Sequence, residues 1–270
     1  MPFPNISPIA FQLGPLAVRW YALGYLAGVL LGAAYGMSML RRKSLWAEGR
    51  PPFEAPAIWD FAFWAIIGIV VGGRTGYVLF YNLPLYAAHP LDVFALWDGG
   101  MSFHGGLIGI MVAVALFTRS KGGNIISSFD LLSACAPIGI FLVRCANFIN
   151  GELYGGVTTL PWGVVFPNAG PLPRHPSQLY EGLLEGVIMF LIIRVVTHVF
   201  YGLRRPGLAA GVFGVWYAIS RILIEFVRVP DPQLGYLFDG WVTMGQILSV
   251  PVLLVGLALI VFAMRKRPLV

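Results

Sequence analysis

Residues 144–155, RCANFINGELYG, place one arginine, two amides and one carboxylate directly after a long apolar run. Arg144 and Asn147 are three residues apart, so on a helix they share one face. Asn150-Gly151 is a strong turn signal, which predicts that the helix ends there and that Glu152 lies beyond it. Groups of this kind at the mouth of an apolar helix indicate a site that binds an anion.

Arg144 has a second interpretation. An arginine at the centre of a membrane helix costs about 2.5–3.5 kcal/mol on insertion scales, so an arginine found there usually has a functional role. Near a helix end, however, its long stem can reach the headgroup layer and leave the charge in water. The residues around Arg144 do not decide between anion binding and this snorkelling arrangement.

A second charged stripe lies on the apolar segment 208–227. Tyr217, Arg221, Glu225 and Arg228 follow one another at spacings of four, four and three residues, which places them on one helical face. Lipid is a poor neighbour for such a stripe, so we expect it to face the protein interior or a wet cavity. A structural Arg221–Glu225 ion pair is the alternative.

His104 stands between two glycine pairs in DGGMSFHGG, residues 98–106, where an apolar segment begins. Histidine is the side chain whose ordinary pKa lies nearest neutrality, and glycines permit close backbone approach. His104 is therefore a candidate general base, with an interface or capping role as the alternative. Cys145, beside Arg144, is either a small buried side chain or a nucleophile with a lowered thiol pKa.

Polar residues also open two other apolar segments. Residues 174–181, RHPSQLYE, precede the fifth segment and carry Glu181, with Glu185 one turn further on. Tyr21 opens the first segment, where an interface aromatic is the alternative to a site residue.

The composition indicates which kind of structural element positions these groups. The chain has 270 residues, of which 58% are hydrophobic and 11% charged, with a mean hydropathy of +0.78. Soluble domains carry about 25% charged residues. Spans of about 20 apolar residues predict an all-α integral membrane protein. Its seven expected transmembrane helices cover approximately 17–40, 57–80, 104–118, 128–149, 178–201, 208–227 and 241–264.

We expect one domain over residues 1–270. The segment from about 151 to 177 is too polar and too broken by glycine and proline to span, so it is predicted to form a small periplasmic head. Glycines recur every fourth residue in the first two segments, which favours close helix packing. They are Gly24, Gly28, Gly32 and Gly36, then Gly68, Gly72 and Gly76.

Basic residues set the expected orientation. The loops 41–56, 119–124 and 202–206 and the C-terminal tail hold most of the 18 lysines and arginines. Seven spans place all four on one side, and basic loops mark the cytoplasmic side. The N-terminus is therefore predicted outside and the C-terminus in the cytoplasm. This topology accounts for the net charge of +6 without nucleic acid, for which there is no motif.

Several arginines and one histidine are thus expected near the outer leaflet. Guanidinium groups suit bidentate phosphate binding, and a phospholipid headgroup is the phosphate at that depth. The residues alone indicate a membrane protein that handles phospholipids.

The motifs together resemble those of bacterial prolipoprotein diacylglyceryl transferases over essentially the whole chain. The matching stretches are R144-x-x-NFINGE-x-x-G155, DGGMSFHGG, HPSQLYE and the Tyr217/Arg221/Glu225 stripe. The family usually has glycine before Asn147 and often before Arg144, where this chain has Ala146 and Val143. That difference concerns local packing and removes no polar group.

The resemblance implies transfer of diacylglyceryl from phosphatidylglycerol to the lipobox cysteine of a prolipoprotein in the bacterial inner membrane, with no metal or organic cofactor. It implies His104, Arg144 and Arg221 as catalytic residues. The implied substrate-binding residues are Tyr21, Arg144, Asn147, Glu152, Gly155, Tyr217 and Glu225. Two other functions remain open: a phospholipid carrier or flippase, and an ion-coupled transporter using Glu181, Glu185 and Glu225.

Overall fold

Seven long apolar helices form the protein. The computed structural model describes residues 1–4, 6–229 and 242–265, and within these residues seven helices are long and apolar enough to cross a membrane. They are α1 (Trp20–Arg41), α2 (Ile58–Phe80), α4 (Phe103–Ser120), α5 (Ile125–Ile149), the composite span Ser177–Val199, α8 (Leu208–Glu225) and α9 (Met244–Arg265). The predicted number of spans and the all-helical membrane part are confirmed.

The ends of α5 follow from local chemistry. The Asn124 side chain accepts hydrogen bonds from the backbone N–H groups of Ile126 (2.9 Å) and Ser127 (3.2 Å), so the helix begins three residues before the predicted start. At the other end Gly151 has φ +66°, which a residue with a side chain rarely adopts. The predicted helix end at Asn150-Gly151 is confirmed.

The fifth span is not one regular α-helix. It runs as α6 (Ser177–Glu181), the π-helix η6 (Gly182–Ile188), α7 (Met189–Arg194) and the π-helix η7 (Val195–Val199). Hydrophobic periodicity did not predict the π-helical turns, which are rare and often occur at functional sites. The first of them begins directly after Glu181.

Small elements outside the spans were also not predicted. A two-stranded antiparallel hairpin, β1 (Ile9–Leu13) and β2 (Leu16–Arg19), precedes α1. The expected first span began at residue 17, within this hairpin. The linker between α2 and α4 holds α3 (Leu83–Ala88) and two 3-10 turns, η4 (Pro90–Phe94) and η5 (Leu96–Asp98).

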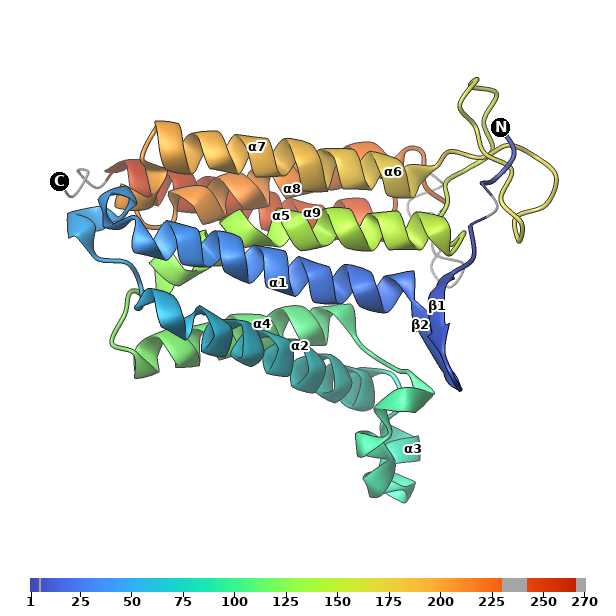
Figure 1. Cartoon of the computed structure of the whole chain (residues 1–270), viewed down its shortest axis with the longest axis horizontal. Coiled ribbons are helices and arrows are strands. Elements are labelled where there is room, and N and C mark those ends of the chain that lie inside the picture. Colours follow the sequence, from blue (N-terminus) through green and yellow to red (C-terminus); the bar gives the residue numbers. More distant parts are fainter. Residues whose placement is uncertain (5, 230–241, 266–270) are drawn as a thin grey trace.

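The helices pack in close pairs along the glycine rows. In Figure 1, α1 lies along α5, and α2 and α4 form a separate pair beside them. A Cβ at Gly72 would lie 2.3 Å from the carbonyl oxygen of Gly105, and one at Gly28 would lie 2.9 Å from the Gly139 Cα. These approaches require glycine, as the spacing predicted.

The bundle has two chemically different ends. One end carries the segment 150–176 and the hairpin, and we call it the head end (Figure 1). There the N-terminal amine of Met1 donates to the Gly163 carbonyl, and Pro2 forms a β-bridge with Val165. The opposite end, called the basic end, carries η1 (Lys43–Leu45), the loop between α4 and α5, and η8 (Gly202–Arg204). This distribution is the one that basic-loop counting predicts.

Candidate active site

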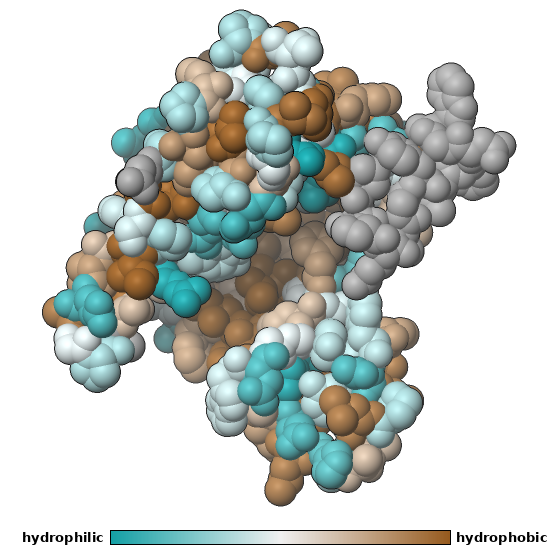
Figure 2. All heavy atoms as spheres, turned by 90° about the vertical axis from the view of Figure 1, so that its right-hand side faces the viewer, coloured by the Kyte–Doolittle hydropathy of each residue, from teal (hydrophilic) through white to brown (hydrophobic). Residues whose placement is uncertain are grey.

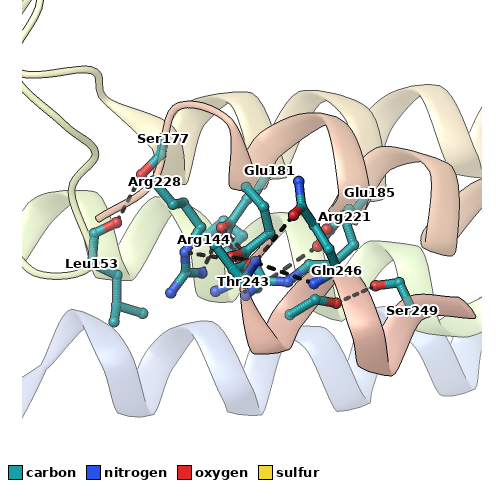
Figure 3. A network of polar contacts seen from close by, with 12 residues as sticks. Arg144, Leu153, Ser177, Glu181, Glu185, Arg221, Arg228, Thr243, Gln246 and Ser249 are labelled. Atoms are coloured by element: carbon teal, nitrogen blue, oxygen red, sulfur yellow. Dashed lines mark hydrogen bonds and ion pairs between the residues drawn. The ribbon is translucent and has the colours of Figure 1, made fainter. Parts of the chain in front are cut away.

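Three arginines gather around one buried carboxylate. Glu181 Oε2 lies 2.7 Å from Arg144 Nε. Its other oxygen, Oε1, lies 3.1 Å from Arg221 Nη1 and 2.9 Å from Arg228 Nη1. Figure 3 shows these side chains converging from α5, α6 and the end of α8. Arg144 and Arg221 are 77 positions apart in the chain but share this one acceptor, so the predicted convergence of the two arginines is confirmed.

Glu225 and Glu185 complete this arginine–glutamate network. Glu225 Oε1 lies 2.8 Å from Arg221 Nη2 and 3.6 Å from Arg228 Nε, and its Oε2 accepts the Thr243 hydroxyl at 2.6 Å. Glu185 Oε2 lies 3.7 Å from Arg144 Nη2. Three carboxylates therefore balance three guanidinium groups, which explains how so many charges are accommodated among apolar helices.

The arginines, not the glutamates, are the accessible part of the network. The side chains of Arg144, Arg221 and Arg228 are 20%, 18% and 13% exposed, whereas those of Glu181 and Glu185 are 0% exposed. A ligand reaching the network therefore meets positive charge first. The carboxylates behind fix the guanidinium orientation, and each guanidinium has five N–H donors, more than these contacts use.

The stripe on α8 is arranged as its spacing predicted. Arg221 and Glu225 pair at i,i+4, and Glu225 and Arg228 pair at i,i+3. The alternative of an Arg221–Glu225 ion pair is therefore correct as geometry, but the pair belongs to a larger network. Tyr217, one turn earlier, is half-buried and stacks on Phe213 with ring centroids 6.2 Å apart.

A second polar cluster surrounds the end of α5. The Asn147 amide donates to Glu152 Oε1 at 2.8 Å and to the Tyr21 hydroxyl at 3.5 Å. The Tyr25 hydroxyl donates to Tyr21 at 3.5 Å, and Gln178 donates to the Glu152 carbonyl. The structure thus joins three predicted residues, Tyr21, Asn147 and Glu152, on the same helix end as Arg144.

Gly155 marks a close crossing of chain segments. Its N–H donates to the His175 carbonyl at 2.8 Å, and it forms an isolated β-bridge with Arg228. A Cβ here would lie 2.3 Å from the Val227 carbonyl oxygen. Glycine at this position lets the head approach the segment directly after α8, which carries Arg228.

A hollow opens at the head end of the bundle. In the space-filling view of Figure 2, hydrophilic residues surround its mouth and hydrophobic residues lie deeper inside. The hollow separates the main body from the smaller lobe below it. Such a shape admits a molecule with a polar head and apolar tails.

His104 is not part of the arginine–glutamate network. It lies in the first turn of α4, where Ser102 caps the helix by accepting from the Gly105 N–H at 3.2 Å. Its ring is exposed and packs edge-on against Phe103. Among the described residues, no hydrogen bond or ion pair links it to Arg144 or Arg221.

Arg74 has a structural role that sequence reasoning did not assign. It is 4% exposed and donates to the carbonyls of residues 92, 93, 95, 99 and 100, at 2.5–3.1 Å. Its guanidinium also lies over the Tyr86 ring. It thus holds the α3–η5 linker and does not join the other arginines.

The central role of Glu181 was also missed. Its place after HPSQLY indicated a residue on the buried side, but helical spacing does not reveal contacts between helices. Arg228 appeared only as the end of a stripe, and Thr243 and Gln178 gave no signal. A carboxylate in an apolar span needs a positively charged partner, so the arginines in the other spans were the signal that could have suggested this pairing.

Fold and site define a class: a polytopic α-helical membrane protein with a guanidinium-lined polar site at one end. The chain matches the sequence model of the prolipoprotein diacylglyceryl transferase family over residues 8–262, so it belongs to that family. It is 54% identical over 255 residues to the phosphatidylglycerol–prolipoprotein diacylglyceryl transferase of Brucella anthropi. The Brucella canis protein of the same name has the same identity, and each comparison covers 94% of this chain and 91% of the relative.

Proposed function

We propose that this chain transfers the diacylglyceryl group of phosphatidylglycerol to the cysteine thiol of a prolipoprotein. The observation that carries this proposal is the convergence of Arg144 and Arg221 on Glu181, with the guanidinium groups accessible and the carboxylate buried. Membership of the family and 54% identity to named transferases support the same reaction. The protein is accordingly a multi-pass enzyme of the bacterial inner membrane.

The reaction requires charge stabilisation more than a protein nucleophile. The substrate sulfur attacks the glyceryl carbon bonded to phosphate, a C–S bond forms, and the C–O bond breaks to release glycerol phosphate. The diester phosphate carries one negative charge and the departing monoester gains a second, while the thiol proton passes to a base. Arg144 and Arg221 are assigned to this developing charge, since preorganised donors stabilise a transition state most where charge appears.

The base is assigned to His104 on chemical grounds. A thiol with a reference pKa of about 8.5 must lose its proton, and histidine is the usual group for this step near pH 7. His104 lies on the α2–α4 pair, away from the arginine–glutamate network, so the proposal requires substrate to bridge the two. His175 in the head is the competing histidine, because burial lowers the pKa of its ring and so favours the neutral form that a base requires.

The remaining predicted residues are assigned to orientation. Asn147, Glu152 and Tyr21 form one hydrogen-bonded cluster beside Arg144, suited to the hydroxyl groups of a glycerol headgroup. Glu225 orients Arg221, and Tyr217 lines the same face of α8. Gly155 permits the close approach of the head. The proposed reaction calls for no metal or organic cofactor.

Topology follows from charge. We place the head end at the periplasmic face and the basic end in the cytoplasm, because basic loops favour the cytoplasmic side. That orientation exposes the site to the outer leaflet, where a lipid and a translocated preprotein can both arrive.

Two rival functions have less support. A carrier or flippase would bind headgroups through the same arginines and release the lipid intact. An ion-coupled transporter using Glu181, Glu185 and Glu225 would need carboxylates free to exchange ions, but each of the three lies within 3.7 Å of an arginine nitrogen. These pairs favour a fixed, preorganised site over a carboxylate that exchanges ions.

One assay separates the three functions. Purified protein is mixed with phosphatidylglycerol and a lipobox peptide, and the peptide mass is measured. We expect a diacylglyceryl adduct on the cysteine, dependent on Arg221. Folded protein that binds the lipid but forms no adduct would overturn the transferase proposal and leave the carrier, and folded protein that neither binds the lipid nor forms the adduct would leave the transporter.

A further inference from the structure

A cavity lies at the basic end of the bundle, opposite the hollow at the head end. It has a volume of about 570 Å³ and lies between the η7–η8 turn, α8 and the end of α9. Val196, Phe200, Leu208, Val212 and Met264 give it apolar walls, and Arg204 and Arg205 stand in its lining. The combination of apolar walls and two guanidinium groups matches one class of ligand.

Among the described residues, these two arginines have no carboxylate partner. Arg204 Nε and Nη2 donate to the Ser44 carbonyl at 3.2 and 2.9 Å, and its guanidinium lies over the Tyr201 ring. Arg205 Nη1 meets the thioether sulfur of Met264 at 2.8 Å, a weak acceptor. Within the described part of the chain neither arginine forms an ion pair. Two half-buried cations are therefore held by neutral groups.

This cavity is distinct from the arginine–glutamate network. Thr243, just before α9, binds Glu225 of that network, whereas Met264 in the last turn of α9 lines the cavity. At 1.5 Å per residue these positions are about 30 Å apart along the helix axis, the thickness of a bilayer core. The same lipid molecule cannot occupy both sites.

We propose that this cavity binds an anionic phospholipid of the leaflet at the basic end. The headgroup phosphate pairs with Arg205 and the free donors of Arg204, and an acyl chain lies against Phe200, Val212 and Met264. Charge complementarity selects the occupant: the described lining residues include two arginines and no carboxylate, so an anionic headgroup is favoured over a zwitterionic one. This site is separate from the transfer reaction, and its ligand is not consumed.

The site also has a structural consequence. Arg204 ties η8 to the α1–α2 loop through Ser44, and Arg205 reaches the end of α9. A phosphate bridging the two would link three segments that meet at this end. Lipid bound there is expected to raise the thermal stability of the folded protein, because it binds the native state and not the unfolded one.

The test uses lipid retention measured by native mass spectrometry. Purified protein is titrated with phosphatidylserine or phosphatidylcholine, comparing wild type with R205Q and with R119Q. Arg119 is an exposed arginine at the same end but outside the cavity, so it controls for general surface charge. R205Q retains the arginine–glutamate network, so lipid bound there is common to all three proteins.

We expect R205Q to bind phosphatidylserine about fivefold more weakly, the effect of about 1 kcal/mol for one cation near a membrane surface. R119Q should bind like wild type, and phosphatidylcholine should show no difference between the variants. Unchanged phosphatidylserine binding in R205Q, or equal losses in R119Q, would overturn the proposal.

A photoactivatable phosphatidylserine gives a second readout that does not depend on substitution. Adducts on peptides containing Phe200 or Met264 support the site. Adducts confined to other peptides, or self-association of the chain through this face, overturn it.

Discussion

Arg144 and Arg221 are held by opposite oxygens of one carboxylate. Arg144 Nε lies 2.7 Å from Glu181 Oε2, and Arg221 Nη1 lies 3.1 Å from Glu181 Oε1. Glu181 is fully buried, and each guanidinium group pairs with a different one of its oxygens. The carboxylate therefore sets the separation of the two guanidinium groups before any ligand arrives. A phosphate between them would meet donors already oriented, which is the condition for strong electrostatic stabilisation of a transition state.

Removing either arginine should abolish most turnover. We expect Arg144→Ala and Arg221→Ala each to lower the transfer rate by about 10²–10³-fold, the usual cost of losing one charge-stabilising donor. Adduct formation measured by peptide mass checks this, with membrane insertion as the control. A near-normal rate in either variant would remove that arginine as the phosphate anchor.

Glu181→Gln tests preorganisation. The amide keeps the volume but loses the charge that holds three arginines, so the rate should fall although no proposed catalytic residue is changed. Glu48, which pairs with Arg50 at the exposed basic end, provides the control Glu48→Gln. Lowered kcat with little change in KM would fit misplaced guanidinium groups. Equal rates for Glu181→Gln and wild type would contradict the proposed role.

The pH dependence of activity tests which histidine is the base. A base must be neutral to work, so activity falls as pH drops through its pKa. Burial lowers the pKa of His175 from the ordinary 6.5, so a rate dependent on His175 would persist to more acidic pH. We expect His104→Gln to lower kcat/KM strongly and His175→Gln to leave kcat/KM and its pH profile unchanged. The reverse result would transfer the role of base to His175.

Asp130 is expected to be important for stability and not for chemistry. Its buried carboxylate accepts the N–H groups of Gly207 (2.7 Å) and Ala210 (2.8 Å), capping α8 from α5 at the basic end. Asp130→Ala leaves these donors unsatisfied, at a cost of about 1–3 kcal/mol. Thermal unfolding in detergent measures the loss, with exposed Asp60→Ala as control. Equal unfolding temperatures for the two variants would contradict it.

Cys145→Ala should be silent in the transfer assay. Cys145 is a free, half-buried thiol on α5, next to Arg144 in sequence but with no assigned contact to substrate. The proposed reaction uses the thiol of the prolipoprotein, so no enzyme cysteine is required. Loss of activity in Cys145→Ala with folding intact would restore the alternative of a cysteine nucleophile.

Local patterns in the sequence determined much of this protein. Apolar runs of membrane length gave the seven spans, Asn150-Gly151 gave the end of α5, and the glycine rows gave the close helix pairs. Helical spacing also placed Arg221, Glu225 and Arg228 on one face, as the structure has them. Each of these features depends on neighbours within a few residues along the chain, and that information is carried by residue order.

Only the tertiary structure decided which charges meet. Glu181 lies 37 residues after Arg144 and 40 before Arg221, and no periodicity relates positions on different helices. The same limit explains Arg74. Like the other arginines it belongs to an apolar segment, but its guanidinium donates hydrogen bonds to backbone carbonyls of the α3–η5 linker. A buried charge needs a partner of opposite charge. Which residue becomes that partner depends on helix packing, because contacts between side chains of different spans are set by how the helices are placed in space.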